Sequence, residues 1–96
     1  MTQVALIEIH LSDRERQALR YLFQGMDRAS IARRLIKADG TSVSSVTVKT
    51  YIERARAKFA AAGRPCRSNF TLLARCVENG LIATEEIFDY SPGDFA

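Results

Sequence analysis

Histidine and cysteine are scarce in this sequence, which has His10 as its only histidine and Cys66 and Cys76 as its only cysteines. A structural zinc site usually takes four cysteine or histidine ligands and a catalytic one takes three, so we expect no metal site. A disulfide between the two thiols is conceivable, but a chain of 96 residues does not need one. We expect Cys76 to be a small buried hydrophobic residue and Cys66 to be an incidental loop thiol.

The residue arrangements of common enzymes are also missing. The sequence has no paired carboxylates, no Cys-His arrangement and no glycine-rich phosphate loop. No histidine accompanies Ser12, Ser44 or Ser45 to activate a nucleophile, so we expect these serines to cap helices. We therefore expect no catalytic residues, no cofactor and no enzymatic activity.

Long apolar runs are absent too. No stretch approaches the roughly eighteen residues needed to span a bilayer, and the first ten residues, MTQVALIEIH, lack the basic region that begins a secretory signal. With 47% apolar and 26% charged residues, the composition is that of one soluble globular domain. We expect a cytoplasmic protein.

The net charge of +3 is unevenly distributed along the chain. Residues 44–67 have only Glu53 as an acid, against six basic side chains: Lys49, Arg54, Arg56, Lys58, Arg64 and Arg67. Residues 83–96 have no basic side chain and four acidic ones: Glu85, Glu86, Asp89 and Asp94. This asymmetry favours a face that binds a polyanion and a separate acidic tail, although a solvated helix surface would have a similar composition.

Two helices are predicted in the first half of the chain. Ser12 and Glu15 form the capping-box pattern Ser-x-x-Glu at the start of the first helix, and Gly25 stands where a left-handed residue would end it. Asp27 can cap the second helix, which has apolar residues at Ile31, Ala32 and Leu35. Before them, residues 4–9 are apolar and partly β-branched, which favours a short strand or an extended arm.

Two further helices are predicted in the second half. Ser44 or Ser45 can cap a helix over residues 45–62, which Gly63 and Pro65 stop. Its buried face is expected from apolar residues at helical spacing: Val48, Ile52, Ala55 and Phe59. Ser68 or Asn69 opens the fourth helix, Gly80 ends it, and Thr84 can cap one more turn.

Two short helices joined by a turn, the second with a basic outer face, form the pattern of a DNA-reading helix-turn-helix. A helix with its side chains is about 10–12 Å across, which suits the major groove of B-DNA, about 12 Å wide. Lys49, Thr50 and Glu53 lie near the start of the third helix, opposite its apolar face. Lysine can donate to guanine, glutamate can accept from cytosine, and threonine can form a hydrogen bond or contact a thymine methyl group.

An ordered series of short motifs makes this pattern specific. The motifs are Leu11-Ser12-x-Arg14-Glu15, Leu19 and Leu22, Gly25, Ile31-Ala32-Arg33-Arg34-Leu35, Val43-Ser44-x-x-Thr47-Val48-Lys49, Lys58-Phe59, and Gly80-Leu81-Ile82. Together they resemble the LuxR-type helix-turn-helix domains of bacterial regulators. The resemblance implies an all-α, four-helix domain over residues 11–82, between an extended arm at 1–10 and an acidic tail at 83–96.

The resemblance also implies roles for particular residues. It places Lys49, Thr50 and Glu53 against bases, and Ser45 and Thr47 near phosphates. The basic residues expected to contact phosphates are Lys49, Arg54, Arg56, Lys58 and Arg64. The fourth helix corresponds to the element that commonly forms a dimer contact, here around Leu72, Arg75, Cys76 and Asn79.

Two segments depart from the family pattern. Seven residues, Ile36 through Ser42, separate Leu35 from Val43, where the family usually has one. A loop of this length could contact the DNA backbone through Lys37, or change the angle at which the third helix meets DNA. The segment from Ala60 to Arg67 is also longer than the usual link.

The expected function is therefore a sequence-specific, double-stranded DNA-binding transcription regulator that acts as a homodimer in the bacterial nucleoid. Only ten residues precede the domain, so we expect a stand-alone module without a receiver or ligand-binding domain. The alternative is a protein-interaction module of the same fold that binds RNA polymerase or another regulator. The insertion and the tail favour this alternative, since the acids of the tail alternate with apolar residues at Ile87, Phe88, Tyr90 and Phe95.

Overall fold

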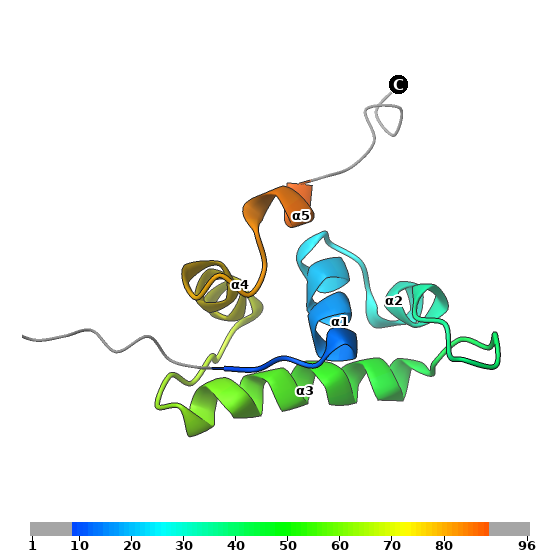
Figure 1. Ribbon diagram of the computed structural model, residues 1–96, viewed down its shortest axis with the longest axis horizontal. Helices are drawn as coiled ribbons and strands as arrows, with labels where there is room; N and C mark the ends of the chain where they lie inside the picture. Colours follow the sequence, from blue (N-terminus) through cyan, green and yellow to red (C-terminus); the bar gives the residue numbers. More distant parts are fainter. Residues whose placement is uncertain (1–8, 89–96) are drawn as a thin grey trace, which may run out of the picture.

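The computed structural model describes residues 9–88 of the chain. These residues form five helices, namely α1 (Asp13–Phe23), α2 (Arg28–Arg34), α3 (Ser45–Ala61), α4 (Asn69–Glu78) and α5 (Thr84–Phe88) (Figure 1). The predicted all-α fold is confirmed. Most of the predicted N-terminal arm lies outside the described residues, as do Asp89, Tyr90, Asp94 and Phe95 of the predicted tail.

Helices α1 to α4 begin at capping residues that the sequence predicts, whereas Thr84, predicted to cap the last turn, is itself the first residue of α5. Ser12 Oγ accepts a hydrogen bond from the Glu15 N–H at 3.1 Å, and Glu15 Oε1 accepts one from the Ser12 N–H at 3.0 Å, which completes the capping box. Three further helices begin at a side-chain cap, formed by Asp27, Ser44 and Ser68. Each cap satisfies an N–H group that the first turn of a helix leaves without an intrahelical partner.

The other helices all lie on one side of α3, the longest helix (Figure 1). Helix α1 is central, because it contacts each of the other four helices, and α3 packs against both α1 and α2. The predicted apolar face of α3 lies in the core, with Val48, Ala55 and Phe59 fully buried and Ile52 8% exposed. The opposite face of α3 is therefore left without a helix packed on it.

Helix α3 ends where its sequence requires a turn. Gly63 has φ +79°, a left-handed conformation that side-chain-bearing residues rarely adopt. The N–H of Arg64 donates to the Phe59 carbonyl at 2.8 Å, and the N–H of Gly63 donates to the Ala60 carbonyl at 3.0 Å. These bonds satisfy carbonyl groups at the helix end, which is the usual role of a glycine at this position.

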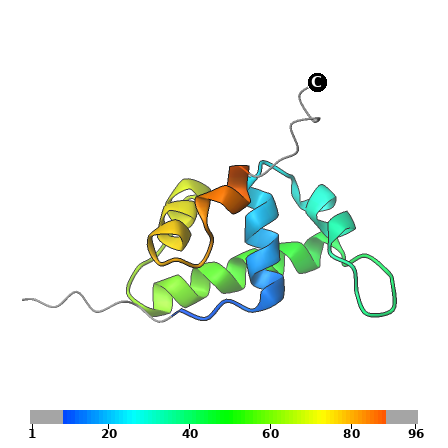
Figure 2. The same ribbon diagram turned by 45° about the horizontal axis from the view of Figure 1, so that its top comes forward.

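The predicted insertion between α2 and α3 forms a small hairpin, residues 36–42. Ile36 and Ser42 form an isolated antiparallel bridge, and the Lys37 N–H donates to the Thr41 carbonyl at 2.7 Å. Asp39 Oδ1 accepts hydrogen bonds from the Thr41 N–H at 3.0 Å and the Thr41 hydroxyl at 2.7 Å. A guanidinium nitrogen of Arg14 donates to the Ile36 carbonyl and ties the hairpin to α1. The hairpin projects from the end of the molecule at which α3 begins (Figure 2).

A fifth helix extends the folded unit beyond residue 82, the boundary expected from the sequence. Helix α5 packs against α1, and Ile87 is only 4% exposed. Glu86 forms an ion pair with Arg16, and its carbonyl accepts a hydrogen bond from Gln24 Nε2 at 2.7 Å. Residues 84–88 of the expected acidic tail are thus part of the domain.

The two cysteines differ from expectation in one respect. Cys76 is fully buried, as predicted for a small hydrophobic residue. Cys66 is only 7% exposed and belongs to the same core cluster, so the prediction of an incidental loop thiol is wrong. The segment before α4 is held against α3 by the hydrogen bond that Arg56 donates to the Cys66 carbonyl at 2.9 Å.

Candidate nucleic-acid interface

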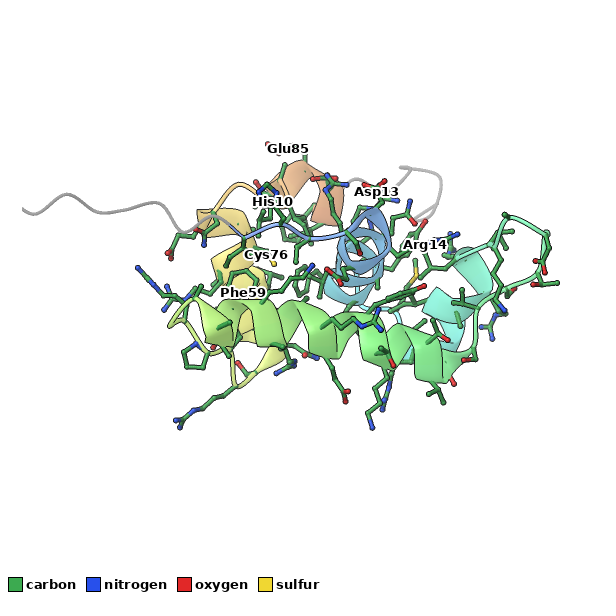
Figure 3. All side chains as sticks on the ribbon, turned by 60° about the horizontal axis from the view of Figure 1, so that its bottom comes forward. His10, Asp13, Arg14, Phe59, Cys76 and Glu85 are labelled. Carbon is green, nitrogen blue, oxygen red and sulfur yellow. The ribbon has the colours of Figure 1, made fainter. Side chains whose placement is uncertain are left out.

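The free side of α3 displays the residues that the sequence predicts to face bases. Lys49 and Glu53 are exposed, and Thr50 is half-exposed. Phe59 and Cys76 lie on the inner side of α3, while the side chains along its outer side point away from the rest of the protein (Figure 3). The apolar face of α3 therefore anchors the helix and leaves its polar face available to a ligand.

Lys49 and Glu53 form a loose ion pair on this face. Their charged groups are 3.8 Å apart, and their side chains are 56% and 61% exposed. An exposed pair one helical turn apart contributes little to stability, so separating it costs little. Lys49 therefore remains available as a hydrogen-bond donor and Glu53 as an acceptor. Both side chains lie over the same part of α3.

The hydroxyl groups at the start of α3 are mostly used within the protein. Thr50 Oγ1 donates to the Val46 carbonyl at 3.1 Å, so its proton is not available to a base. Thr47 is half-buried, and its Oγ1 lies 3.0 Å from Ser44 Oγ in the helix cap. Ser45 is exposed in the first turn, where a helix carries partial positive charge.

Besides Lys49, which pairs with Glu53, three of the basic residues predicted to contact phosphates have partners inside the domain. Arg56 donates to the Cys66 carbonyl at 2.9 Å and to the side chain of Asn69. Arg64 Nη1 lies 3.6 Å from the carboxylate of Glu78. Lys58, the third, is held by two oxygens.

Lys58 ties the end of α3 to the start of α1. Its ammonium group lies 2.6 Å from Glu15 Oε1 and 2.7 Å from the His10 carbonyl oxygen. Lysine and glutamate thus make a structural pair, and the expectation that Lys58 contacts phosphate is revised. Arg54 is exposed and has no such tie among the described residues, so it remains a candidate phosphate contact.

Glu15 is the one buried charged residue among those described, at 4% exposed. Burial by itself raises the pKa of this carboxyl, but the hydrogen bonds from Lys58 and Ser12 and the positive charges of Lys58 and Arg54 outweigh that effect. The pKa of Glu15 therefore lies below its ordinary value. The Glu15 carboxylate accepts hydrogen bonds from Ser12 and Lys58, so its role is structural, which agrees with the capping role predicted from the sequence.

Two open grooves run beside the free face of α3, and Arg28 and Lys49 line both. The first lies between the start of α2 and the start of α3 and is also lined by Asp27, Ala29, Ser45 and Val46. The second continues along α3 and is also lined by Leu22, Ile52, Glu53, Arg56 and Asn69. Cations therefore stand along the edge of α3 that faces α2.

Arg28 and Val46 were missed by the sequence analysis. Arg28 directly follows the capping residue Asp27, and this first position of the second helix was the available signal. Val46 is 70% exposed in the first turn of α3, and its spacing of three from Lys49 was the signal there. Neither residue was predicted, because Val46 is uncharged and Arg28 lies outside the basic segment of residues 44–67.

The residues predicted to form a dimer contact on α4 are largely unavailable. Leu72 and Cys76 are fully buried in the core of their own domain, so neither can meet a second copy. Arg75 is half-buried and bonded to Glu78 at 3.1 Å, and the Asn79 side chain donates to the Arg75 carbonyl at 2.8 Å. The outward side of α4 instead presents Phe70, which is 78% exposed, and Ala74.

Between residues 9 and 88, no three histidine, cysteine, aspartate or glutamate side chains gather in a group that could hold a metal ion. None of the five described helices is both long enough and apolar enough to cross a membrane.

Comparison with known proteins places the chain in a family. The sequence model of the family described as "Bacterial regulatory proteins, luxR family" matches residues 10–66, which is more than half of the 96 residues. The match includes α1, α2, the hairpin and α3, and it ends before α4. No curated protein and no solved structure matches the chain. The resemblance predicted from the sequence is confirmed, and the chain belongs to the luxR family of bacterial regulatory proteins.

Proposed function

We propose that this protein is a transcription regulator that binds specific sites in double-stranded DNA by inserting α3 into the major groove. The observation that carries the proposal is the division of α3 into two faces. One face is buried along its length from Val48 to Phe59, and the other is solvent-exposed and holds Lys49 and Glu53. A rigid helix with a free polar face has the width and the donor and acceptor groups that the groove requires.

Each group on this face has a defined task in the proposal. Lys49 donates to guanine O6 and N7, and Glu53 accepts from cytosine N4. Thr50, whose hydroxyl proton is bound to the helix, can only accept a hydrogen bond or make an apolar contact. Arg28 and Arg54 contact phosphates at the edges of the groove, with Ser45 beside them at the start of α3. Thr47 is assigned to the helix cap, because its hydroxyl already contacts Ser44.

The test begins with selection of a binding site from a random double-stranded library. Affinity for the selected site is then compared with affinity for unrelated DNA, at several salt concentrations. Lys49→Ala should weaken binding to the selected site by about 1–3 kcal/mol and relax the base preference at one position. Arg20→Ala is the matched control, because it removes one positive charge from α1, on the core side of α3.

A wild-type protein that selects no site would overturn the proposal. So would a Lys49→Ala variant that binds the selected site as tightly as the wild type. The rival function, an interaction module for RNA polymerase or another regulator, requires a different result. It predicts that such a protein co-purifies with the wild type after nuclease treatment and that Lys49→Ala leaves this association unchanged.

We also propose that the protein acts on DNA as a homodimer, because one helix-turn-helix reads only a few base pairs. The contact is assigned to the outward side of α4, around Phe70 and Ala74, in place of the buried residues first expected. A phenylalanine that is 78% exposed on a helix is a candidate for burial by a second copy. The selected DNA site would then contain two half-sites related by a two-fold axis.

A further inference from the structure

Val46 is the one large hydrophobic residue of α3 that is strongly exposed in the described part of the chain. Its side chain is 70% exposed and has no place in the core. Helix formation does not favour valine at this position either, because β-branched residues form helices less readily than alanine. Single exposed hydrophobic residues are common on proteins, so the position of Val46 must decide whether it has a function.

Val46 lies on the proposed reading face, the side of α3 that holds Lys49, Thr50 and Glu53. Residues three, four and seven positions apart share one side of a helix, and Lys49, Thr50 and Glu53 stand at these separations from Val46. The Thr50 hydroxyl donates to the Val46 carbonyl at 3.1 Å, which fixes the two residues one turn apart. Val46 also lines the groove between α2 and α3 together with Arg28 and Lys49. The valine is therefore surrounded by the groups assigned to DNA.

We infer that Val46 is a specificity-determining residue that contacts the C5-methyl group of a thymine in the major groove. The inference rests on the proposed function and deepens it. The thymine methyl is the apolar group that base pairs present in the major groove, whereas phosphates and the other base edges are polar. Removing the valine and thymine methyl surfaces from water is favourable, and no other base edge in the major groove carries a methyl group.

The helix geometry gives the order in which the bases are read. Val46 and Glu53 are seven residues apart, which corresponds to roughly 10 Å along the helix axis. Base pairs follow one another at about 3.4 Å along the DNA axis and are farther apart along the groove, so the face from Val46 to Glu53 covers at most about three of them. The thymine read by Val46 lies at the end of this short stretch nearest the start of α3, and the bases read by Lys49 and Glu53 follow it.

The inference is tested by exchanging thymine for uracil in the selected site, one position at a time. Uracil keeps every hydrogen-bonding group of thymine and lacks only the methyl group. For the wild type, one thymine in each half-site should be sensitive, with a loss of about fourfold in affinity, the effect of transferring about one methyl-sized group. Val46→Ala should bind the thymine site about as weakly as the wild type binds the uracil site, and should be insensitive to the exchange.

Two controls keep the test independent of folding and of general surface effects. Val46→Thr nearly preserves the shape of the side chain and exchanges a methyl for a hydroxyl group, so it should lose part of the thymine preference. Phe88→Ala truncates another exposed hydrophobic residue, 65% exposed on α5, and should keep the full sensitivity to uracil. A wild type that binds its selected site and tolerates every exchange would overturn this inference alone. Retained sensitivity in Val46→Ala would do the same. A wild type that selects no DNA site would overturn both this inference and the proposed function.

Discussion

The ammonium group of Lys58 lies 2.6 Å from Glu15 Oε1, so the last turns of α3 are tied to the first turn of α1. The Glu15 side chain is 5% exposed and that of Lys58 is 39% exposed. Glu15 also receives the Ser12 N–H, so one carboxylate links the cap of α1 to α3. The pair holds the proposed reading helix at a fixed angle to the rest of the domain.

The first prediction concerns the pH dependence of stability. Because the pKa of Glu15 is lowered in the folded state, its contribution is fully present above its ordinary pKa and is lost as the pH falls through the folded-state value. Glu15→Gln can keep the bond to the Ser12 N–H but removes the charge. At pH 7 it should lower the free energy of unfolding by about 1–3 kcal/mol. Denaturant titrations should show the difference from the wild type shrinking below about pH 4.5.

Lys58→Met provides the companion measurement, because it leaves the buried carboxylate without its main partner. This variant should be destabilised at pH 7 and should regain stability relative to the wild type as Glu15 becomes protonated. Equal wild-type and Glu15→Gln stabilities at pH 7 would show that the pair has no structural role.

The second prediction separates structural cations from those that contact phosphates. Arg54→Ala should reduce the slope of log affinity against log salt concentration by about 1, because one phosphate contact is lost. Lys58→Ala should leave this slope unchanged, because Lys58 is held by Glu15 and His10. Fluorescence anisotropy with labelled DNA at several salt concentrations measures both slopes. A reduced slope for Lys58→Ala and an unchanged slope for Arg54→Ala would reverse the assignment.

The third prediction concerns the hairpin of residues 36–42. Its backbone bonds and the hydrogen bond from Arg14 to the Ile36 carbonyl hold the hairpin in place beside α1, and Lys37 is exposed on it. Lys37→Ala should weaken binding to selected and unrelated DNA by the same factor, because a phosphate contact carries no sequence information. Lys37→Arg keeps the charge and should restore binding. A loss confined to the selected site would instead mean that the hairpin reads bases.

The fourth prediction concerns association of two copies through α4. Phe70→Asp places a charge at the centre of the proposed contact and should give a monomer in sedimentation experiments, with a large loss of affinity for a site of two half-sites. Because Phe70 is 78% exposed, the free energy of unfolding of the monomer should change little. Glu85→Lys, which alters an exposed charge on α5, is the control and should remain a dimer. A wild type that sediments as a monomer both free and on DNA would remove this part of the proposal.

The fifth prediction concerns thiol reactivity. Burial raises the pKa of Cys76 to about 12 and also raises the pKa of Cys66. Since the thiolate is the reactive form, a thiol reagent at pH 8 should label neither cysteine rapidly in the folded protein. Cys66→Ser isolates Cys76, whose labelling should occur only as fast as the domain opens and should accelerate at denaturant concentrations that unfold it. Rapid labelling of Cys76 under native conditions would contradict its place in the core.

Local rules in the sequence were sufficient for the helices and for the buried side of α3. Capping residues such as Ser12 and Asp27 act over three positions, and the spacing of Val48, Ile52 and Phe59 repeats with the helix, so both are visible without a fold. The family followed from the order of such local motifs. The all-α architecture and the free face of Lys49 and Glu53 were predictable for the same reason.

Only the tertiary structure decided which charged and apolar groups are available. Lys58 and Arg54 look alike in the sequence, but Lys58 meets Glu15, 43 positions away, and Arg54 remains exposed. Cys66 and Leu72 are buried in a core that all five helices share, whereas Phe70, two positions from Leu72, is exposed. Helical periodicity predicts which residues share a face. Burial and ion pairing depend instead on what packs against that face, and this packing is set by contacts between segments far apart in the chain.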